Sequence, residues 1–201
     1  MEQKKMRKKT KLVCGIGRND YDENVRVNGK PIHSYTTWLG MMNRCYSEKV
    51  QEKQHTYRGC SVCNEWLSFS NFKKWYDENY PKHLVDMNIR VELDKDLLVE
   101  GNKVYSPETC IFIPKRVNKF LSIKYKKNKS GYVGVTFYTN YDKWVAHINE
   151  FNSEKIKHLG YFTDVKDAGK AYQKAREEQC EKAKAWLREL GYEENIIEKI
   201  R

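Results

Sequence analysis

The stretch that decides the fold is SGYVGVTFYTNYDKWVAHINEFNSEKIKHLGYFTDVKDAGKAYQKA, residues 130–175. Its first part contains three short runs in which β-branched and aromatic residues recur at every second position, and polar turns separate the runs. The runs are YVGVTFY (132–138), KWVAHIN (143–149) and KIKHLGY (155–161). A period of two is typical of a strand with one buried face. The stretch therefore predicts a three-stranded antiparallel meander.

From Thr163 onward the spacing of apolar residues changes to three and four, which is typical of a helix. Thr163 is a candidate N-cap, and Asp164 and Asp167 follow it where a helix start favours negative charge. The stripe consists of Val165, Ala168, Tyr172, Ala175, Gln179, Ala183, Trp186 and Leu190, and Gly191 is a candidate stop signal. Because alanines let a helix approach closely, we expect this helix to cover one face of the meander and leave the other face free.

A set of residues in this stretch resembles the DNA-binding domain of the Apetala/ethylene-response-factor family, which is also found in phage and mobile-element nucleases. Order and spacing match at Gly134-Val135, Trp144-Val145-Ala146, Ile148, Leu159-Gly160-Tyr161-Phe162, Ala168 and Ala171-Tyr172. The resemblance implies that the exposed sheet face lies in the major groove of double-stranded DNA, where a small β-ribbon fits.

The resemblance places seven side chains on the DNA face. They are Val133, Thr136, Tyr138, Lys143, His147, Asn149 and His158. Several of these positions are arginine in the plant proteins, whereas here they are mostly neutral. Bidentate reading of guanine by arginine is therefore not available from them, and we expect a different target. The alternative is an ordinary sheet-plus-helix domain whose exposed face is merely solvated.

The composition bounds the class of protein. With 201 residues the chain can form one large or two small domains with real cores. It contains no apolar run long enough to span a membrane, and its N-terminus lacks the apolar segment of a signal peptide. We expect a soluble protein in the cytoplasm of a bacterial host, without a membrane partner. Its six cysteines fit reduced thiols better than a disulfide framework.

The net charge of +11 is unevenly distributed. Residues 115–129 hold seven basic residues and no acidic one, whereas residues 130–178 hold seven of each. Basic segments beside a groove-reading sheet neutralise phosphates and make affinity steeply dependent on salt. We therefore expect Lys124, Lys126 and Lys127 to contact DNA. An RNA partner, an acidic protein partner or a solvated linker would carry the same charge.

The rest of the chain divides by composition and periodicity. We expect a basic tail and loops at 1–29, a first module at 30–120, a basic linker at 121–129 and a second module at 130–190 with an extended C-terminal helix. Asn28-Gly29 is typical of a tight hairpin turn. Helices are predicted at 32–46, with Ser34 as candidate N-cap, and at 69–80. Each carries a stripe of aromatic residues that is most simply core.

Between the two predicted helices, Cys60 and Cys63 have the spacing of half a zinc site. The sequence holds no second pair with that spacing, and the scattered candidates for completing a site are Cys45, Cys110, His55 and His83. Two buried structural cysteines are the favoured interpretation, and zinc is the alternative.

Residues 91–120 predict a strand–loop–strand–helix unit, with paired strands at 91–93 and 110–113 and a helix that begins near Lys115. Together with upstream spacings, this unit resembles the HNH-type, homing-endonuclease-like nucleases of phages over residues 30–120. The residues that carry the resemblance are Tyr35, Trp38, Met41, Arg44-Cys45-Tyr46, Trp66, Phe69, Phe72, Tyr105-Ser106-Pro107-Glu108 and Cys110. It implies a ββα-metal-like fold and metal-dependent cleavage of DNA.

The HNH resemblance also implies a catalytic set. It puts Asp94 at a metal-ligand position and Lys95 at the general-base position, which is histidine in active members. Thr109 replaces the loop-orienting asparagine, and Asn118 takes the last polar position. A Mg²⁺ or Mn²⁺ ion would lie between Asp94 and Asn118, with Asp96 as a second carboxylate. A lysine with an ordinary pKa of about 10.4 takes no proton from water, but it could serve as the base if desolvation lowered that pKa. The alternative for residues 94–96 is a solvated loop with local ion pairs.

We therefore expect an α+β protein, with an HNH-like module followed by a three-stranded sheet packed on one helix. The expected function is binding of double-stranded DNA, with HNH-type endonuclease activity as the inherited chemistry. Two other classes stay open. A catalytically inactive HNH-derived regulator would bind DNA without cutting it. A phage factor directed at a host protein would use the aromatic-rich N-terminal half as its interface.

Overall fold

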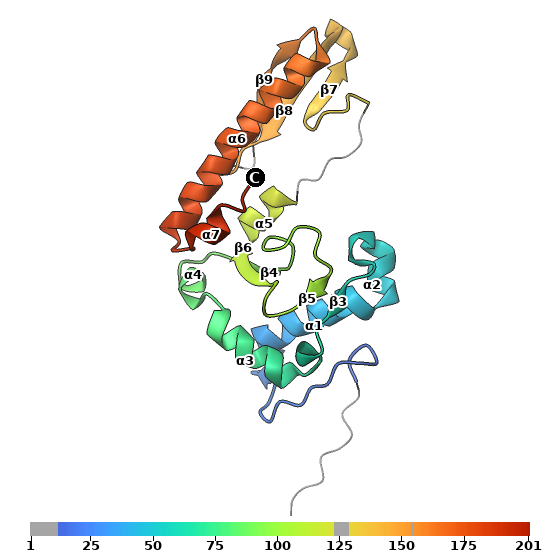
Figure 1. The fold of residues 1–201 in the computed structure, drawn as a ribbon, viewed down its shortest axis with the longest axis vertical. Coiled ribbons are helices and arrows are strands. Elements are labelled where there is room, and N and C mark those ends of the chain that lie inside the picture. Colours follow the sequence, from blue (N-terminus) through green and yellow to red (C-terminus); the bar gives the residue numbers. More distant parts are fainter. Residues whose placement is uncertain (1–11, 123–128, 154) are drawn as a thin grey trace, which may run out of the picture. The chain divides into compact units, whose positions relative to one another are not determined.

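The structure is a computed structural model that describes residues 12–122, 129–153 and 155–201. It is an α+β protein that divides into two compact units, Met1–Ile113 and Pro114–Arg201 (Figure 1). Across the described ranges, helices fall short of the length and apolar character that a membrane span requires.

The first unit combines helices with short paired strands. Its elements are β1 (Arg26–Val27), β2 (Lys30–Pro31), α1 (His33–Tyr46), α2 (Glu48–Lys53), η1 (His55–Tyr57), β3 (Ser61–Val62), η2 (Glu65–Leu67), α3 (Phe69–Asn79), α4 (Lys82–Asp86), β4 (Val91–Asp94), β5 (Val104–Tyr105) and β6 (Ile111–Pro114). β1 pairs with β2, β3 with β5, and β4 with β6. The predicted helices at 32–46 and 69–80 and the predicted pairing of strands near 91 and 110 are thus confirmed.

An aromatic core joins α1 to α3 in the first unit. Trp38 and Met41 of α1 and Phe69 and Phe72 of α3 are completely buried. The Trp38 indole donates a hydrogen bond of 2.7 Å to the backbone carbonyl of Trp66, which satisfies its polar edge. Each such side chain contributes about 1.5–3 kcal/mol by leaving water. The aromatic stripes predicted from the sequence are core.

The start of α1 differs from the prediction, although the turn before it does not. Asn28 and Gly29 have φ of 50° and 75°, as the tight turn between β1 and β2 requires. Ser34 is not the N-cap, because α1 begins at His33 and Ser34 is buried inside the helix. Ile32 precedes the helix in an extended conformation, held by a bond from its N–H to the carbonyl of Val25.

The second unit holds the predicted meander and its covering helix. Its elements are α5 (Lys115–Leu121), β7 (Val135–Tyr138), η3 (Thr139–Tyr141), β8 (Lys143–Asn149), β9 (Ile156–Phe162), α6 (Val165–Glu189) and α7 (Glu194–Ile197). The strands form one antiparallel sheet in the order β7-β8-β9, which confirms the meander. The first strand begins at Val135 and not at residue 132, because Gly134 has φ of +67° and leaves the extended conformation.

Helix α6 runs along one face of this sheet, as Figure 1 shows. Val135 and Ala146 are cross-strand partners, and both are buried against Ala168 of the helix. Contact is close at Gly134, where a Cβ atom would overlap the Tyr172 ring. One face of the sheet is therefore sealed by α6, as the alanine-rich stripe predicts.

The ends of α6 agree with the prediction to within one residue. Asp164, not Thr163, is the N-cap, and its carboxylate accepts the backbone N–H of Lys166 at 2.6 Å. Gly191, with φ of +79°, follows the last turn and confirms the predicted stop.

Helix α5 packs within the second unit. The guanidinium of Arg176 on α6 lies 3.6 Å from the centre of the Phe120 ring, and two of its nitrogens donate to the Phe120 carbonyl at 3.3 Å. Phe120 also meets Phe151 edge-on at 5.4 Å. The boundary between units consequently falls after Ile113, and the helix assigned to the first module on sequence belongs to the second.

Candidate nucleic-acid interface

The sheet face opposite α6 collects side chains through the alternation of its strands. Ala146 and Ile148 of β8 are buried, so the residues between and beside them point the other way. Cross-strand partners point to the same face of a sheet, so the register also identifies the residues of β7 and β9 that lie on this face. The pairs are Tyr138 with Lys143, Thr136 and Tyr161 with Val145, His158 with His147, and Ile156 with Asn149. We call these nine residues the outer face.

Six of the seven residues that the sequence predicts to contact DNA lie on the outer face, namely Thr136, Tyr138, Lys143, His147, Asn149 and His158. Val133 does not, because it precedes β7 and the turn at Gly134 separates it from the strand. Val133 is half-buried.

Sequence reasoning missed Val145, Ile156 and Tyr161. A bulge explains Tyr161, because the register shifts between Ala146 and His147. Ile156 lies two residues from the predicted His158, so alternation in the sequence already pointed to it. Strict alternation backward from Tyr161 would turn His158 and Ile156 toward α6, whereas the extra residue returns both to the outer face. Val145 lies two residues from both Lys143 and His147, which the sequence placed on this face, so the alternation of the strand could have identified it.

The outer face contains one lysine, two histidines and one asparagine, and no acid. It carries the amine of Lys143, the imidazoles of His147 and His158, and the amide of Asn149; none of its nine residues is Asp or Glu. Such a set suits a polyanion, because phosphate oxygens accept from amines, imidazoles and amides. The predicted phosphate contacts Lys124, Lys126 and Lys127 lie outside the described residues.

Aromatic rings form a ridge along one end of the outer face. Tyr138 packs on Tyr141 at 5.4 Å between ring centres, Tyr141 meets Tyr161 at 5.6 Å, and Tyr161 meets His158 at 4.8 Å. The three tyrosines are nevertheless 44%, 63% and 54% exposed. A contiguous group of exposed rings is typical of a binding surface.

The dimensions of the sheet suit the major groove of duplex DNA. Neighbouring strands lie about 4.8 Å apart, so three strands measure about 10 Å across. The major groove is about 12 Å wide and admits a β-ribbon. Helix α6 covers the opposite face and does not obstruct this approach.

The predicted nuclease residues lie in a tightly bonded loop after β4. One carboxylate oxygen of Asp94 accepts the backbone N–H groups of Asp96 and Leu97, at 2.8 and 2.7 Å. Burial raises the pKa of Asp94 against the opposing effect of these bonds. Lys95 is only 5% exposed, and its amine donates to Asp96 at 2.5 Å and to the carbonyl of Asn102 at 2.7 Å.

This loop does not fit a divalent cation well. The Lys95 amine already occupies the Asp96 carboxylate, where it would repel a metal ion, and Asp94 caps its own loop. The Lys95 amine is engaged as a hydrogen-bond donor within this loop. No three His, Cys, Asp or Glu side chains within residues 12–122, 129–153 and 155–201 gather as a metal site would need.

The remaining predicted catalytic residues have separate positions. The Thr109 hydroxyl donates to the carbonyl of Val104 at 2.8 Å, and so it ties the segment between β5 and β6 together. Asn118 is half-buried on α5 in the second unit, whereas Asp94 belongs to the first. Asp94 and Asn118, the two metal ligands that the resemblance implies, therefore belong to different units.

Cys60 and Cys63, the C-X-X-C pair, belong to the apolar core of the first unit. Cys60 is buried in the aromatic core, and Cys63 packs against that core. Burial raises the pKa of Cys63, and it raises the pKa of Cys45 and of Cys110 to about 12. Zinc binds the thiolate, so a raised pKa makes a thiol a weaker zinc ligand.

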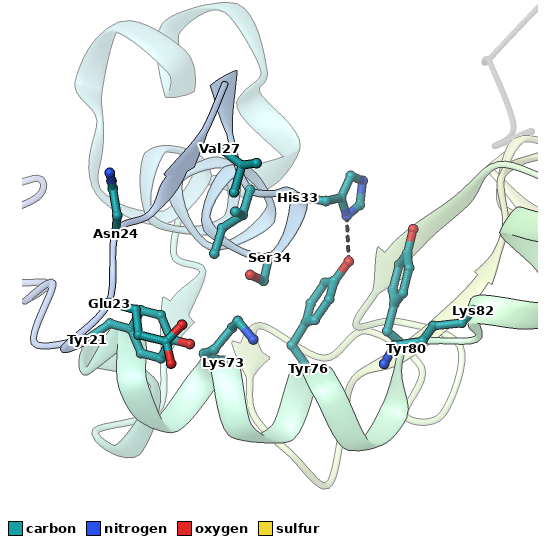
Figure 2. Close-up of a pocket in the computed structure, with 11 residues that line it drawn as sticks. Tyr21, Glu23, Asn24, Val27, His33, Ser34, Lys73, Tyr76, Tyr80 and Lys82 are labelled. Atoms are coloured by element: carbon teal, nitrogen blue, oxygen red, sulfur yellow. Dashed lines mark hydrogen bonds between the residues drawn. The ribbon is translucent and has the colours of Figure 1, made fainter. Parts of the chain in front are cut away.

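A pocket of about 390 Å³ lies between the hairpin before α1 and helix α3 (Figure 2). Figure 2 shows His33 and Tyr76 facing each other there, with 2.6 Å between Nδ1 and the phenol oxygen. Burial lowers the pKa of His33 and raises that of Tyr76, so burial favours the neutral form of both groups. Sequence reasoning missed this pocket, because its lining comes from separate segments that share no motif.

Comparisons of the chain with protein-family models, with curated proteins and with solved structures find no match. The function is therefore argued from the residues and their geometry. Of the sites above, the outer face combines the most features that point to one kind of partner.

Proposed function

We propose that this protein binds double-stranded DNA, with the outer face of the β7-β8-β9 sheet in the major groove. The observation that carries the proposal is the make-up of that face. It presents amine, imidazole, amide and exposed aromatic groups without a carboxylate, on a sheet whose other face is sealed by α6.

The overall charge supports the same partner. The chain carries a net charge of +11, and its excess of basic residues falls in 1–12 and in 115–129, the second of which lies directly before the sheet in sequence. Phosphate contacts from such a segment supply affinity without sequence preference, while the sheet reads base edges. An acidic protein partner would use the charge but would leave the groove-sized sheet without a role.

The test compares two charge reversals in the full chain. Lys143→Glu changes the outer face, whereas Lys174→Glu changes an exposed position of α6 by the same charge. We expect Lys143→Glu to weaken binding to a duplex of mixed sequence by about tenfold, and Lys174→Glu by about twofold or less, in fluorescence anisotropy at low salt. The proposal would be contradicted if the two variants lost affinity for the duplex equally, or if the unaltered chain did not bind the duplex.

A second candidate function is DNA cleavage by an HNH-type site. The observation that favours it is the order of elements, since β4 pairs with β6 and α5 follows β6 directly, as the resemblance implies. We derive no hydrolytic step, because the loop around Asp94 and Lys95 does not fit a divalent cation in this arrangement.

Incubation with supercoiled plasmid decides between the two candidates. The full chain and Asp94→Ala are each tested with Mg²⁺, with Mn²⁺ and with chelator, and nicked and retarded species are recorded on the same gel. Metal-dependent nicks that vanish in Asp94→Ala would establish the nuclease. Retarded complexes without nicks would favour the catalytically inactive regulator.

A further inference from the structure

The outer face is poor in groups that read guanine and rich in groups that read A·T pairs. Arginine is absent from its nine positions, and its one amine, that of Lys143, lies at the start of β8 beside the preceding turn. Guanine is read most often by arginine or lysine, adenine by the amide of asparagine or glutamine, and thymine by apolar contact with its methyl group. Cross-strand partners form rows across the sheet, and each row can be compared with the groups that a base pair presents in the major groove.

One row pairs an amide with an aliphatic side chain. Asn149 is exposed at the end of β8, and its cross-strand partner Ile156 is 65% exposed. Among the described residues, none forms a hydrogen bond with the Asn149 amide. Cross-strand partners have Cβ atoms about 5 Å apart, so one base pair can meet both. The amide matches adenine N6 and N7, and the isoleucine matches the methyl group of the thymine paired with it.

A second row presents apolar surface and two hydroxyls. Thr136, Val145 and Tyr161 lie side by side across the three strands. Tyr161 is held between Tyr141 and His158, so its ring is in place before any ligand arrives. A methyl group and a ring edge in this position favour thymine, since cytosine has a hydrogen where thymine has its methyl group.

We infer that the outer face recognises A·T base pairs at two positions, through Asn149 with Ile156 and through Val145 with Thr136 and Tyr161. The inference rests on the proposed function. Val145 and Asn149 are four residues apart, or about 13 Å along the strand. With base pairs stacked about 3.4 Å apart, the two A·T positions are separated by about four steps where the strand follows the groove.

The first experiment is selection of duplexes by the full chain from a library of random sequence at physiological salt. We expect the selected sites to share A·T pairs at two positions about four base pairs apart. Replacing thymine by deoxyuridine in a selected site removes only the methyl group. We expect this replacement to weaken binding by about fourfold at each of the two positions, the value of one buried methyl group, and to change nothing elsewhere.

A pair of matched variants tests which base-pair position the row of Asn149 and Ile156 contacts. Asn149→Ala should abolish the adenine preference at one position while retaining salt-dependent binding to duplex of any sequence. Asn152→Ala is the control, because Asn152 is an exposed asparagine in the turn between β8 and β9. Both side chains are exposed, so circular dichroism should show the same fold for both.

The outcomes separate this inference from the proposed function. Duplex binding with selected G·C pairs, or binding that is indifferent to deoxyuridine, overturns the A·T inference and leaves the proposed function standing. No duplex binding at any salt concentration overturns both. A preference for single-stranded DNA also overturns both, because the tyrosine ridge would then act as a platform for stacked bases.

Discussion

At the residue scale, Gly134 determines how closely the sheet approaches α6. Its φ of +67° is a conformation that residues with a Cβ adopt at a cost, and an added Cβ would overlap the Tyr172 ring and lie 2.5 Å from the carbonyl oxygen of His147. We expect Gly134→Ala to lower the free energy of unfolding by about 2–5 kcal/mol, from backbone strain together with overpacking. Urea unfolding followed by circular dichroism measures this loss.

Gly131→Ala separates the two causes. Gly131 has φ of +75° but no atom within 4 Å of an added Cβ. We expect it to cost only the backbone term, about 1–2 kcal/mol. If the two variants lost the same stability, close contact with Tyr172 would not be the reason for glycine at position 134.

Single-residue assignments were the least predictable from sequence. Thr163 and Asp164 are adjacent and both suit an N-cap, and only the bond from Lys166 distinguishes them. The HNH resemblance gives Lys95 the place of a catalytic histidine. Its amine is instead bonded within its own loop to Asp96 and Asn102, an arrangement that no local pattern predicts.

At the scale of elements, the polar residue in the apolar stripe of α6 has a structural task. Gln179 is 1% exposed, and its side-chain carbonyl accepts the backbone N–H of Phe151 at 2.8 Å. We expect Gln179→Leu to lower the free energy of unfolding by about 1–3 kcal/mol, because the buried N–H of Phe151 loses its acceptor. Thermal or urea unfolding measures the change.

Gln173→Leu is the matched control for this prediction. It makes the same substitution on the same helix at an exposed position, and we expect a change within about 0.5 kcal/mol. A loss of similar size in both variants would show that leucine itself harms the helix and that the bond to Phe151 contributes little.

Periodicity predicted the elements well because burial on one face imposes it. The alternation in 143–149 and the three-to-four spacing from Val165 reproduce β8 and α6 almost to the residue. The bulge opposite Ala146 was not predictable in this way, because one extra residue leaves the composition of β9 unchanged. Tyr161 was missed for that reason.

At the scale of the whole molecule, charge outside the sheet should control general affinity. The residues concerned, Lys124, Lys126 and Lys127, belong to the basic run at 115–129. We expect their joint replacement by glutamine to weaken binding to all duplexes alike. The slope of log affinity against log salt should flatten by about one for each phosphate that is no longer neutralised. Anisotropy titrations from low to physiological salt measure the slope. A weakening confined to one DNA sequence would contradict the assignment.

The division into two units was only partly predictable. Local patterns revealed both modules and the helix at Lys115, but α5 joins the second unit through Phe120 and Arg176, which are 56 residues apart in the chain. Periodicity cannot report a contact across that separation. Most of the outer face was found from sequence because strand alternation and family spacing agree there, whereas the pocket at His33 and Tyr76 has no comparable signature.

Residues that build the fold and residues that would meet DNA under the proposed function lie on opposite faces of the sheet. Ala146 and Val135 pack on α6, while Asn149, Ile156 and Tyr161 contribute little to that packing. Substitutions on the outer face can therefore accumulate without unfolding the domain. In evolution this permits a lineage to change its target site rapidly. In the laboratory it makes the outer face a starting point for libraries from which new specificities are selected.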